Sequence, residues 1–119
     1  MHRRQPIKSF INAGRGVYFA IREERNMIIH LVIALIVIIL AFVLGLEKFE
    51  FIIVLLCIAL VLVTETINTA FEYMVDLFHG PKIDPVVKIL KDVASAAVLM
   101  ACVFSAIIGI WLFLPKIIR

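Results

Sequence analysis

The sequence has few of the residues that a water-soluble or disulfide-bonded fold requires. Only 18% of its 119 residues are charged and only two are cysteines, whereas 64% are hydrophobic. Soluble domains average about 45–50% apolar residues, so this excess is too large for one water-facing core. The composition excludes an ordinary soluble globule, a disordered chain and a disulfide-stapled secreted module. It predicts a small integral membrane protein with one all-α domain.

The common signatures of nucleotide and metal sites are also missing. There is no G-x-x-x-x-G-K-[ST] phosphate loop and no kinase catalytic-loop or D-F-G motif. Cys and His do not occur at metal-ligand spacing, and Cys57 and Cys102 lie in apolar runs, where a thiol usually acts as a small hydrophobic group. A formal charge of +3 does not indicate a nucleic acid partner. Any nucleotide chemistry therefore needs an unrelated type of site.

Three segments are predicted to cross a membrane as helices, namely residues 27–46, 49–77 and 93–114. A helix of 20 residues spans about 30 Å, which is one hydrocarbon thickness, and backbone groups in lipid must be paired within their segment. The second segment has only 15 apolar residues, Phe49–Val63, so we expect its crossing to be completed by the polar stretch up to Leu77.

Short connections are expected between these helices. Glu47–Glu50 links the first two, and a segment with Gly80 and Pro81 links the second to the third. Asp84–Pro85 has the pattern of an N-cap followed by proline at the first helical position. Pro115 is expected to end the third span.

Residues 7–25 repeat apolar groups at helical spacing, with basic side chains on much of the other face. This predicts an amphipathic helix that lies on the membrane surface, and packing against the bundle is a compatible alternative. The amino-terminal arm and the second loop carry nine of the Lys and Arg residues, against three in the first loop and the carboxyl tail. That bias predicts a cytoplasmic N-terminus. Small residues recur every four positions on the third span and favour close helix packing within the bundle or between subunits: Ala97, Ala101, Ser105 and Gly109. Three spans make a thin bundle, so we also expect a homo-oligomer.

Polar side chains form a stripe at the end of the second segment. Glu65, Asn68, Glu72 and Asp76 are spaced three, four and four apart, so they fall within an arc of about 80° on one helix face. A carboxylate in or near hydrocarbon costs several kcal/mol unless it is neutralised or paired. The stripe therefore indicates a site for a cation or proton, or a base in a dry place. In the alternative interpretation Glu72 and Asp76 are solvated beyond the membrane, and Asn68 makes an interhelical hydrogen bond.

Further polar residues lie where the first and third spans begin. Glu24 precedes the first span, and Lys91 and Asp92 precede the third at the same predicted surface. Acids from two helices and a lysine from a third are typical of a site for Mg²⁺ and phosphate. Alternatively, Glu24 is an exposed first-turn acid and Lys91-Asp92 a capping and snorkelling pair. His30 either lines the polar interior or, as we favour, hydrogen-bonds a neighbouring helix.

The run Glu65-x-x-Asn68-Thr-Ala-x-Glu72-x-x-x-Asp76, followed by Lys91-Asp92-x-x-Ser-Ala-Ala, resembles the prokaryotic diacylglycerol kinase family. The resemblance extends over nearly the whole chain. The Glu-Arg-Asn stretch before His30 and the Leu-Pro-Lys ending are more similar to the undecaprenol kinase branch, since the branch that acts mainly on diacylglycerol tends to carry an acid at the position of His30. Undecaprenol and diacylglycerol both remain open as acceptors.

The resemblance implies a homotrimer in the bacterial cytoplasmic (inner) membrane, with an interfacial helix and three spans per chain. It implies transfer of the γ-phosphate of Mg·ATP to a lipid alcohol at the cytoplasmic surface. It also implies residue roles. Glu65 would be the general base, Glu24 and Glu72 the Mg²⁺ ligands, Asn68 part of the nucleotide–metal site, Lys91 a phosphate contact, Asp92 an orienting group and Asp76 an accessory contact.

Two other classes of protein remain as alternatives. A small ion-coupled transporter would use the intramembrane acids for proton exchange, but such proteins usually have four spans and polar residues at the midplane. Here three spans are predicted, and the polar residues gather at one surface. A non-catalytic assembly or regulatory subunit would not need acids on two helices facing a lysine on a third.

Overall fold

The computed structural model describes residues 5–81 and 84–119 and places nearly all of them in four helices. These are α1 (Pro6–Glu23), α2 (Arg25–Val43), α3 (Lys48–His79) and α4 (Pro85–Ile117). The described ranges contain no strand, so the all-α prediction is confirmed. Three of the helices, α2, α3 and α4, are long and apolar enough to cross a membrane. Arg3, Arg4 and Lys82 count toward the predicted orientation but lie outside the described residues.

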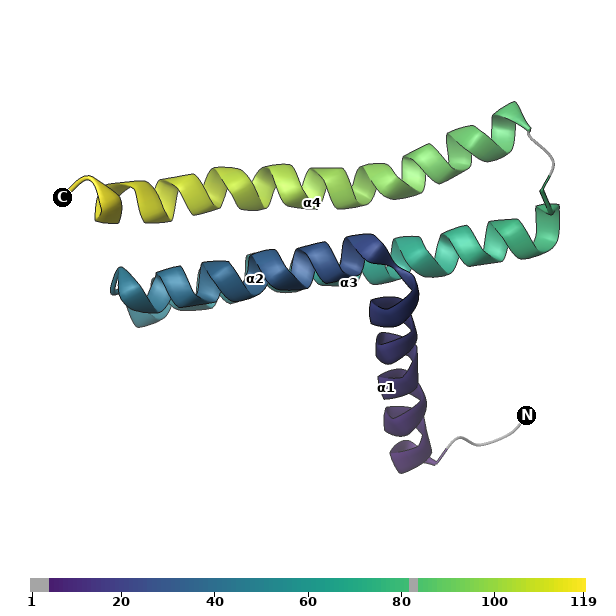
Figure 1. Cartoon of the computed structure of the whole chain (residues 1–119), viewed down its shortest axis with the longest axis horizontal. Coiled ribbons are helices and arrows are strands. Elements are labelled where there is room, and N and C mark those ends of the chain that lie inside the picture. Colours follow the sequence, from purple (N-terminus) through teal and green to yellow (C-terminus); the bar gives the residue numbers. More distant parts are fainter. Residues whose placement is uncertain (1–4, 82–83) are drawn as a thin grey trace.

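The three long helices run side by side, and α1 leaves them at nearly a right angle (Figure 1). Packing is most extensive between α3 and α4, followed by α2 against α3. The buried apolar residues are mostly small, so the helices approach closely at these points: Ala20, Ala34, Ala41, Ala101, Val54, Val98 and Met27. Most large apolar side chains are exposed, as expected for a thin bundle whose solvent is lipid.

Helix lengths divide the molecule into a crossing part and a projecting part. At 1.5 Å per residue, the 19 residues of α2 span about 29 Å, whereas the 32 residues of α3 span about 48 Å. The tight connection after Val43 sets the end of α2 beside the start of α3, so the second half of α3 projects beyond the start of α2 (Figure 1). Most of the polar stretch up to Leu77 lies on this projecting part of α3.

Local capping explains where the long helices begin and end. Glu47 and Glu50 form a capping box at the start of α3, so Glu50 belongs to the helix rather than to the predicted link. Gly80 ends α3 with φ +78°, a conformation that glycine adopts without strain. The predicted N-cap of α4 is confirmed, since the Val86 backbone N–H donates to Asp84 Oδ1 at 2.8 Å.

The prediction that Pro115 ends the third span is wrong, because α4 continues to Ile117. A proline inside a helix removes one backbone donor and crowds the preceding turn. Contacts with the first turn of α3 and with the connection after α2 hold this last turn in place. Lys116 Nζ lies 3.2 Å from Glu50 Oε1, and the Arg119 guanidinium donates to the Leu44 carbonyl at 2.9 Å.

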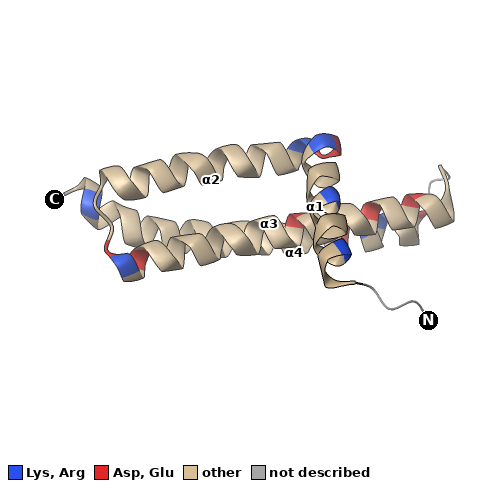
Figure 2. Cartoon of the chain, turned by 90° about the horizontal axis from the view of Figure 1, so that it is seen from below, with Lys and Arg blue, Asp and Glu red and all other residues tan. Residues whose placement is uncertain are grey.

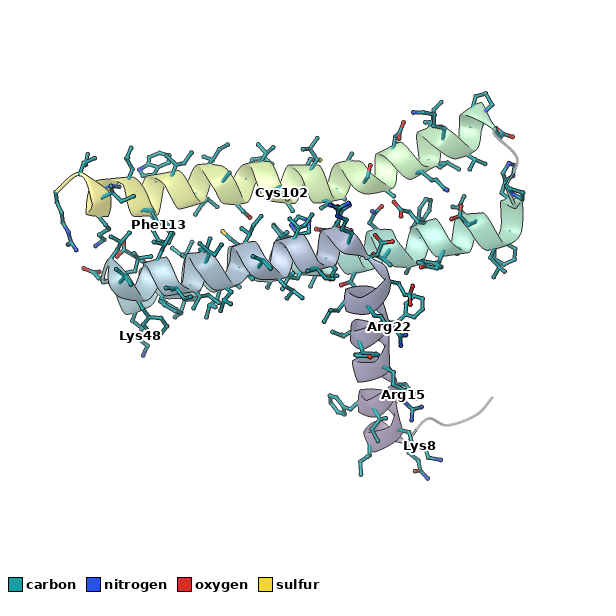
Figure 3. The ribbon with its side chains drawn as sticks, in the orientation of Figure 1. Lys8, Arg15, Arg22, Lys48, Cys102 and Phe113 are labelled. Carbon is teal, nitrogen blue, oxygen red and sulfur yellow. The ribbon has the colours of Figure 1, made fainter. Side chains whose placement is uncertain are left out.

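The helix α1 keeps most of its apolar face free. Phe10 is 79% exposed, and Ile7, Val17 and Tyr18 are also exposed. Lys8, Arg15 and Arg22 lie on the side that faces the projecting ends of α3 and α4 (Figure 3). At its carboxyl end α1 touches the bundle, where Ala20 is buried and Phe19 packs edge-to-face on Tyr73 with ring centroids 5.3 Å apart. This arrangement is typical of a surface-lying helix that is also fastened to the bundle.

Removal of the N-cap should loosen the start of α4. We expect Asp84→Ala to cost about 1 kcal/mol, or a factor of about five in local opening, because one backbone donor of the first turn loses its partner. Hydrogen exchange of the amides near Val86 in detergent micelles measures this change. Asp84→Asn keeps a capping oxygen and is the matched control. Equal protection in all three proteins would contradict the capping assignment.

Candidate active site

The polar stripe of α3 begins at the level where α1 and α2 meet. Glu65 is only 2% exposed there, and Asn68 and Thr69 are also buried. The Thr69 hydroxyl donates to the Glu65 carbonyl at 2.9 Å, which satisfies it within the helix. Figure 2 shows charged residues on α1, near both ends of α2 and on the projecting part of α3 and α4, whereas the middle of α2 carries none.

Of the two oxygens of the Glu65 carboxylate, one has a polar side chain of another helix beside it. His30 Nε2 on α2 lies 3.4 Å from Glu65 Oε2, and this contact joins the two helices. Glu65 Oε1 is buried without a hydrogen-bond partner among the described residues. Burial of an unsatisfied carboxyl oxygen is costly, and such an atom in a native site calls for a functional explanation. The interpretation that Glu65 is a base in a dry place fits this geometry.

One turn further along α3, an amide and two carboxylates come together. Asn68 Nδ2 donates to Glu72 Oε1 at 3.2 Å, while Asn68 Oδ1 is buried without a partner in the described chain. Glu24, at the junction of α1 and α2, faces the same region. Its partial burial and the negative charges of Glu72 and Glu65 raise the pKa of the Glu24 carboxyl above its ordinary value. The excess negative charge and the free amide oxygen suit a hard divalent cation.

A lysine completes the outer part of the stripe. Lys91 on α4 forms an ion pair with Asp76 on α3, so it reaches across to the stripe as the sequence predicted. Asp92 does not reach the stripe: it is exposed and pairs with Lys88 one turn earlier on α4, at 2.9 Å. Within one chain, the structure thus brings Asn68 to Glu72 and Lys91 to Asp76 on the stripe and leaves Asp92 on the outside.

No group of three metal-ligating side chains forms within the described part of the chain. This does not conflict with Mg²⁺, which usually binds one or two carboxylates together with waters and substrate phosphates. Glu24, Glu72 and Asn68 carry oxygen atoms that could hold such an ion.

An apolar groove of about 590 Å³ runs between α2, α3 and α4. His30 lies at the end of the groove nearest to Glu65, and Ile117 lines the other end. Cys57 and Cys102 line its middle and are free thiols, so their role as small hydrophobic groups is consistent with the structure.

The functional residue that sequence reasoning undervalued is His30. We favoured a hydrogen bond to a neighbouring helix, and the structure shows a 3.4 Å contact with Glu65 on α3 instead; His30 was not predicted to belong to the site. The sequence feature that could have identified His30 is its position, since it is an ionisable side chain one turn into an apolar span. The partner could not be identified, because spacing along one helix does not show which residue of another helix lies opposite.

Comparison with known proteins agrees with the resemblance drawn from the motifs. The sequence model of a family described as prokaryotic diacylglycerol kinase matches residues 11–113. An undecaprenol kinase of Bacillus subtilis is 42% identical over 110 residues, which cover 92% of this chain and 89% of the relative. A diacylglycerol kinase of Synechocystis sp. is 38% identical over 110 residues, which cover 92% of this chain but 63% of the relative. No solved structure matches the chain. These relatives do not support the transporter alternative.

The buried carboxylate should reduce the stability of the protein. We expect Glu65→Gln to raise the free energy of unfolding by about 1–3 kcal/mol, because a neutral amide of the same shape is less costly to bury than an ionised group. Thermal unfolding in detergent without nucleotide measures this effect as an increase in Tm. Glu23→Gln, which neutralises an exposed carboxylate, should leave Tm nearly unchanged. A lower Tm for Glu65→Gln would contradict the expected cost.

Proposed function

Because the chain belongs to the prokaryotic diacylglycerol kinase family and is therefore a membrane lipid kinase, we propose that it transfers the γ-phosphate of Mg·ATP to the hydroxyl of a membrane lipid alcohol. The observation that carries this proposal is the buried Glu65 at the inner end of the polar stripe that continues through Asn68, Glu72 and Asp76. Undecaprenol is the acceptor that we favour, in view of the 42% identical relative. Diacylglycerol, which would give phosphatidic acid, is the second candidate because of the other relative.

The order of groups along α3 suits a reaction between a lipid and a water-soluble donor. Glu65 lies at the level of α1, where a lipid head group would approach, and Glu72 and Asp76 follow on the projecting part of the helix. ATP would approach this projecting part from the cytoplasm. We propose on this basis that the site faces the cytoplasm in the bacterial inner membrane, with the N-terminus on the same side.

Glu65 is the proposed general base. It takes the proton of the lipid hydroxyl while that oxygen forms a bond to the γ-phosphorus, and the bond from this phosphorus to the β–γ bridging oxygen breaks to release ADP. A base must lie within hydrogen-bond reach of the proton that it removes. The unpartnered Oε1 atom is the free acceptor for that proton. Burial of Glu65 keeps water from competing with the alcohol.

The remaining residues position and neutralise the donor, which is most of what phosphoryl transfer requires. Glu24 and Glu72, with the Asn68 amide oxygen, would hold Mg²⁺, which when bound neutralises charge on the phosphates. Lys91 would contact the phosphates, and Asp76 keeps this ammonium beside the stripe. Asp92 would orient the nucleotide from the outer side of α4.

We propose a homotrimer as the working form. Each chain is a thin bundle with extensive exposed apolar surface. The small residues in the middle of α4 face α3 within the chain, where Ala101 is buried and the Ser105 hydroxyl donates to the Cys57 carbonyl at 3.4 Å, so the exposed large apolar side chains are the surface left for neighbouring subunits. The partial ligand set of one chain also leaves room for groups from a neighbouring subunit.

The proposed reaction has a direct test. Purified protein in mixed micelles with Mg²⁺ and γ-labelled ATP should move label into undecaprenol faster than into diacylglycerol. Glu65→Gln should lower kcat by at least about 100-fold and largely spare Mg·ATP binding, because the loss of a general base removes a factor of about 10²–10⁴. Full activity in this variant would exclude Glu65 as the base. Absence of label in both lipids, with a folded wild-type oligomer, would contradict the proposed reaction.

The metal assignment has a separate test. We expect Glu24→Gln and Glu72→Gln each to weaken Mg²⁺-dependent ATP binding by about 10-fold or more, since each removes one anionic ligand. Titration calorimetry with ATP at several Mg²⁺ concentrations measures the change. Glu23→Gln, adjacent to Glu24 but exposed, is the matched control. An unchanged Mg²⁺ dependence in either variant would remove that residue from the metal site.

A further inference from the structure

His30 is placed to act on the proposed base. It is the ionisable side chain of α2 that lies beyond the first turn, and its side chain is only 17% exposed. Its Nε2 atom lies 3.4 Å from Glu65 Oε2 across the contact between α2 and α3. No other cation is paired with Glu65 among the described residues, because Lys91 pairs with Asp76 and Lys88 with Asp92.

The surroundings of Glu65 make this contact important. Glu24 and Cys102 lie within electrostatic range of the carboxylate from the start of α2 and from α4. Glu72 adds a further negative charge on α3 itself. Among the described residues, His30 is the basic group in direct contact with this buried carboxylate, and a ring N–H at that position can fix the direction of the carboxylate.

The two carboxylate oxygens are in different situations. Oε2 faces His30, whereas Oε1 is buried and has no partner in the described chain. A carboxylate held at one oxygen presents the other in a fixed direction, as a base needs when its proton donor must be aligned.

We propose that His30 is a positioning residue for Glu65: it holds Oε2 from the neighbouring helix so that Oε1 receives the proton of the lipid alcohol. This inference rests on the proposed role of Glu65 as the base. It adds a residue on a second helix, so the relative position of α2 and α3 becomes part of the catalytic geometry.

The test separates positioning from general stability. In the micelle assay, His30→Leu should lower kcat about 10–100-fold, the loss expected when a reacting group is misplaced by about 1 Å. KM for Mg·ATP should change by less than about twofold, because the nucleotide groups are untouched. His30→Gln keeps an N–H donor and should recover kcat to within about fivefold of wild type. His79→Leu, near the end of α3, is the control for loss of a histidine.

The same His30 substitution in a Glu65→Asp protein tests whether His30 acts through Glu65. Glu65→Asp withdraws the carboxylate by about one bond, or 1.5 Å, so the contact with His30 is lost. Adding His30→Leu to this variant should then lower kcat by less than about threefold. Circular dichroism shows whether His30→Leu folds. If it does not, His30→Gln is compared with the shorter His30→Asn, and only His30→Gln should retain activity.

Three results would overturn the proposal: an equal loss in the wild-type and Glu65→Asp backgrounds, a KM for Mg·ATP that rises in step with the loss, or folded His30→Gln as impaired as folded His30→Leu or His30→Asn. Wild-type activity in Glu65→Gln would instead overturn the base assignment on which the inference rests. Impaired Glu65→Gln together with any of the three results would leave the proposed function standing without a role for His30.

Discussion

The proposed site depends on the burial of one carboxylate, that of Glu65, where the helices meet. Glu65 is excluded from solvent where α2 packs on α3, beside His30. Such a group is unfavourable for folding and favourable for proton abstraction. The remaining polar contacts, from His30 on one side to the amide and acids on the other, can be understood as responses to this charge.

Because the helices have unequal lengths, the buried Glu65 lies between the membrane-crossing part and the projecting part of the molecule. Because α2 has about one membrane thickness and α3 and α4 have considerably more, the lipid side and the aqueous side of the site are built from the same two continuous helices. A rigid helix transmits position well. The separation between proposed acceptor and donor sites is therefore fixed by the rise of α3 rather than by a flexible loop.

Much of this architecture could be predicted from the sequence, for identifiable reasons. Long apolar runs leave the backbone no option but a helix, the cap at Asp84 depends on adjacent residues, and the stripe from Glu65 to Asp76 follows from helix periodicity. Features that depend on contacts between elements could not be predicted. Pro115 stays helical because Lys116 and Arg119 hold the last turn, Asp92 is drawn to Lys88, and the contact between His30 and Glu65 joins two helices.

The right-angled attachment of α1 has a consequence for the depth of the protein in the bilayer. A helix that lies in the head-group plane sets one level, and the far connection between α2 and α3 sets another about 29 Å away. Hydrophobic mismatch therefore acts directly on the height of Glu65 relative to the lipid head groups. A thicker bilayer would draw the two levels into the hydrocarbon and a thinner one would expose them, so the rate of the proposed reaction would depend on membrane thickness.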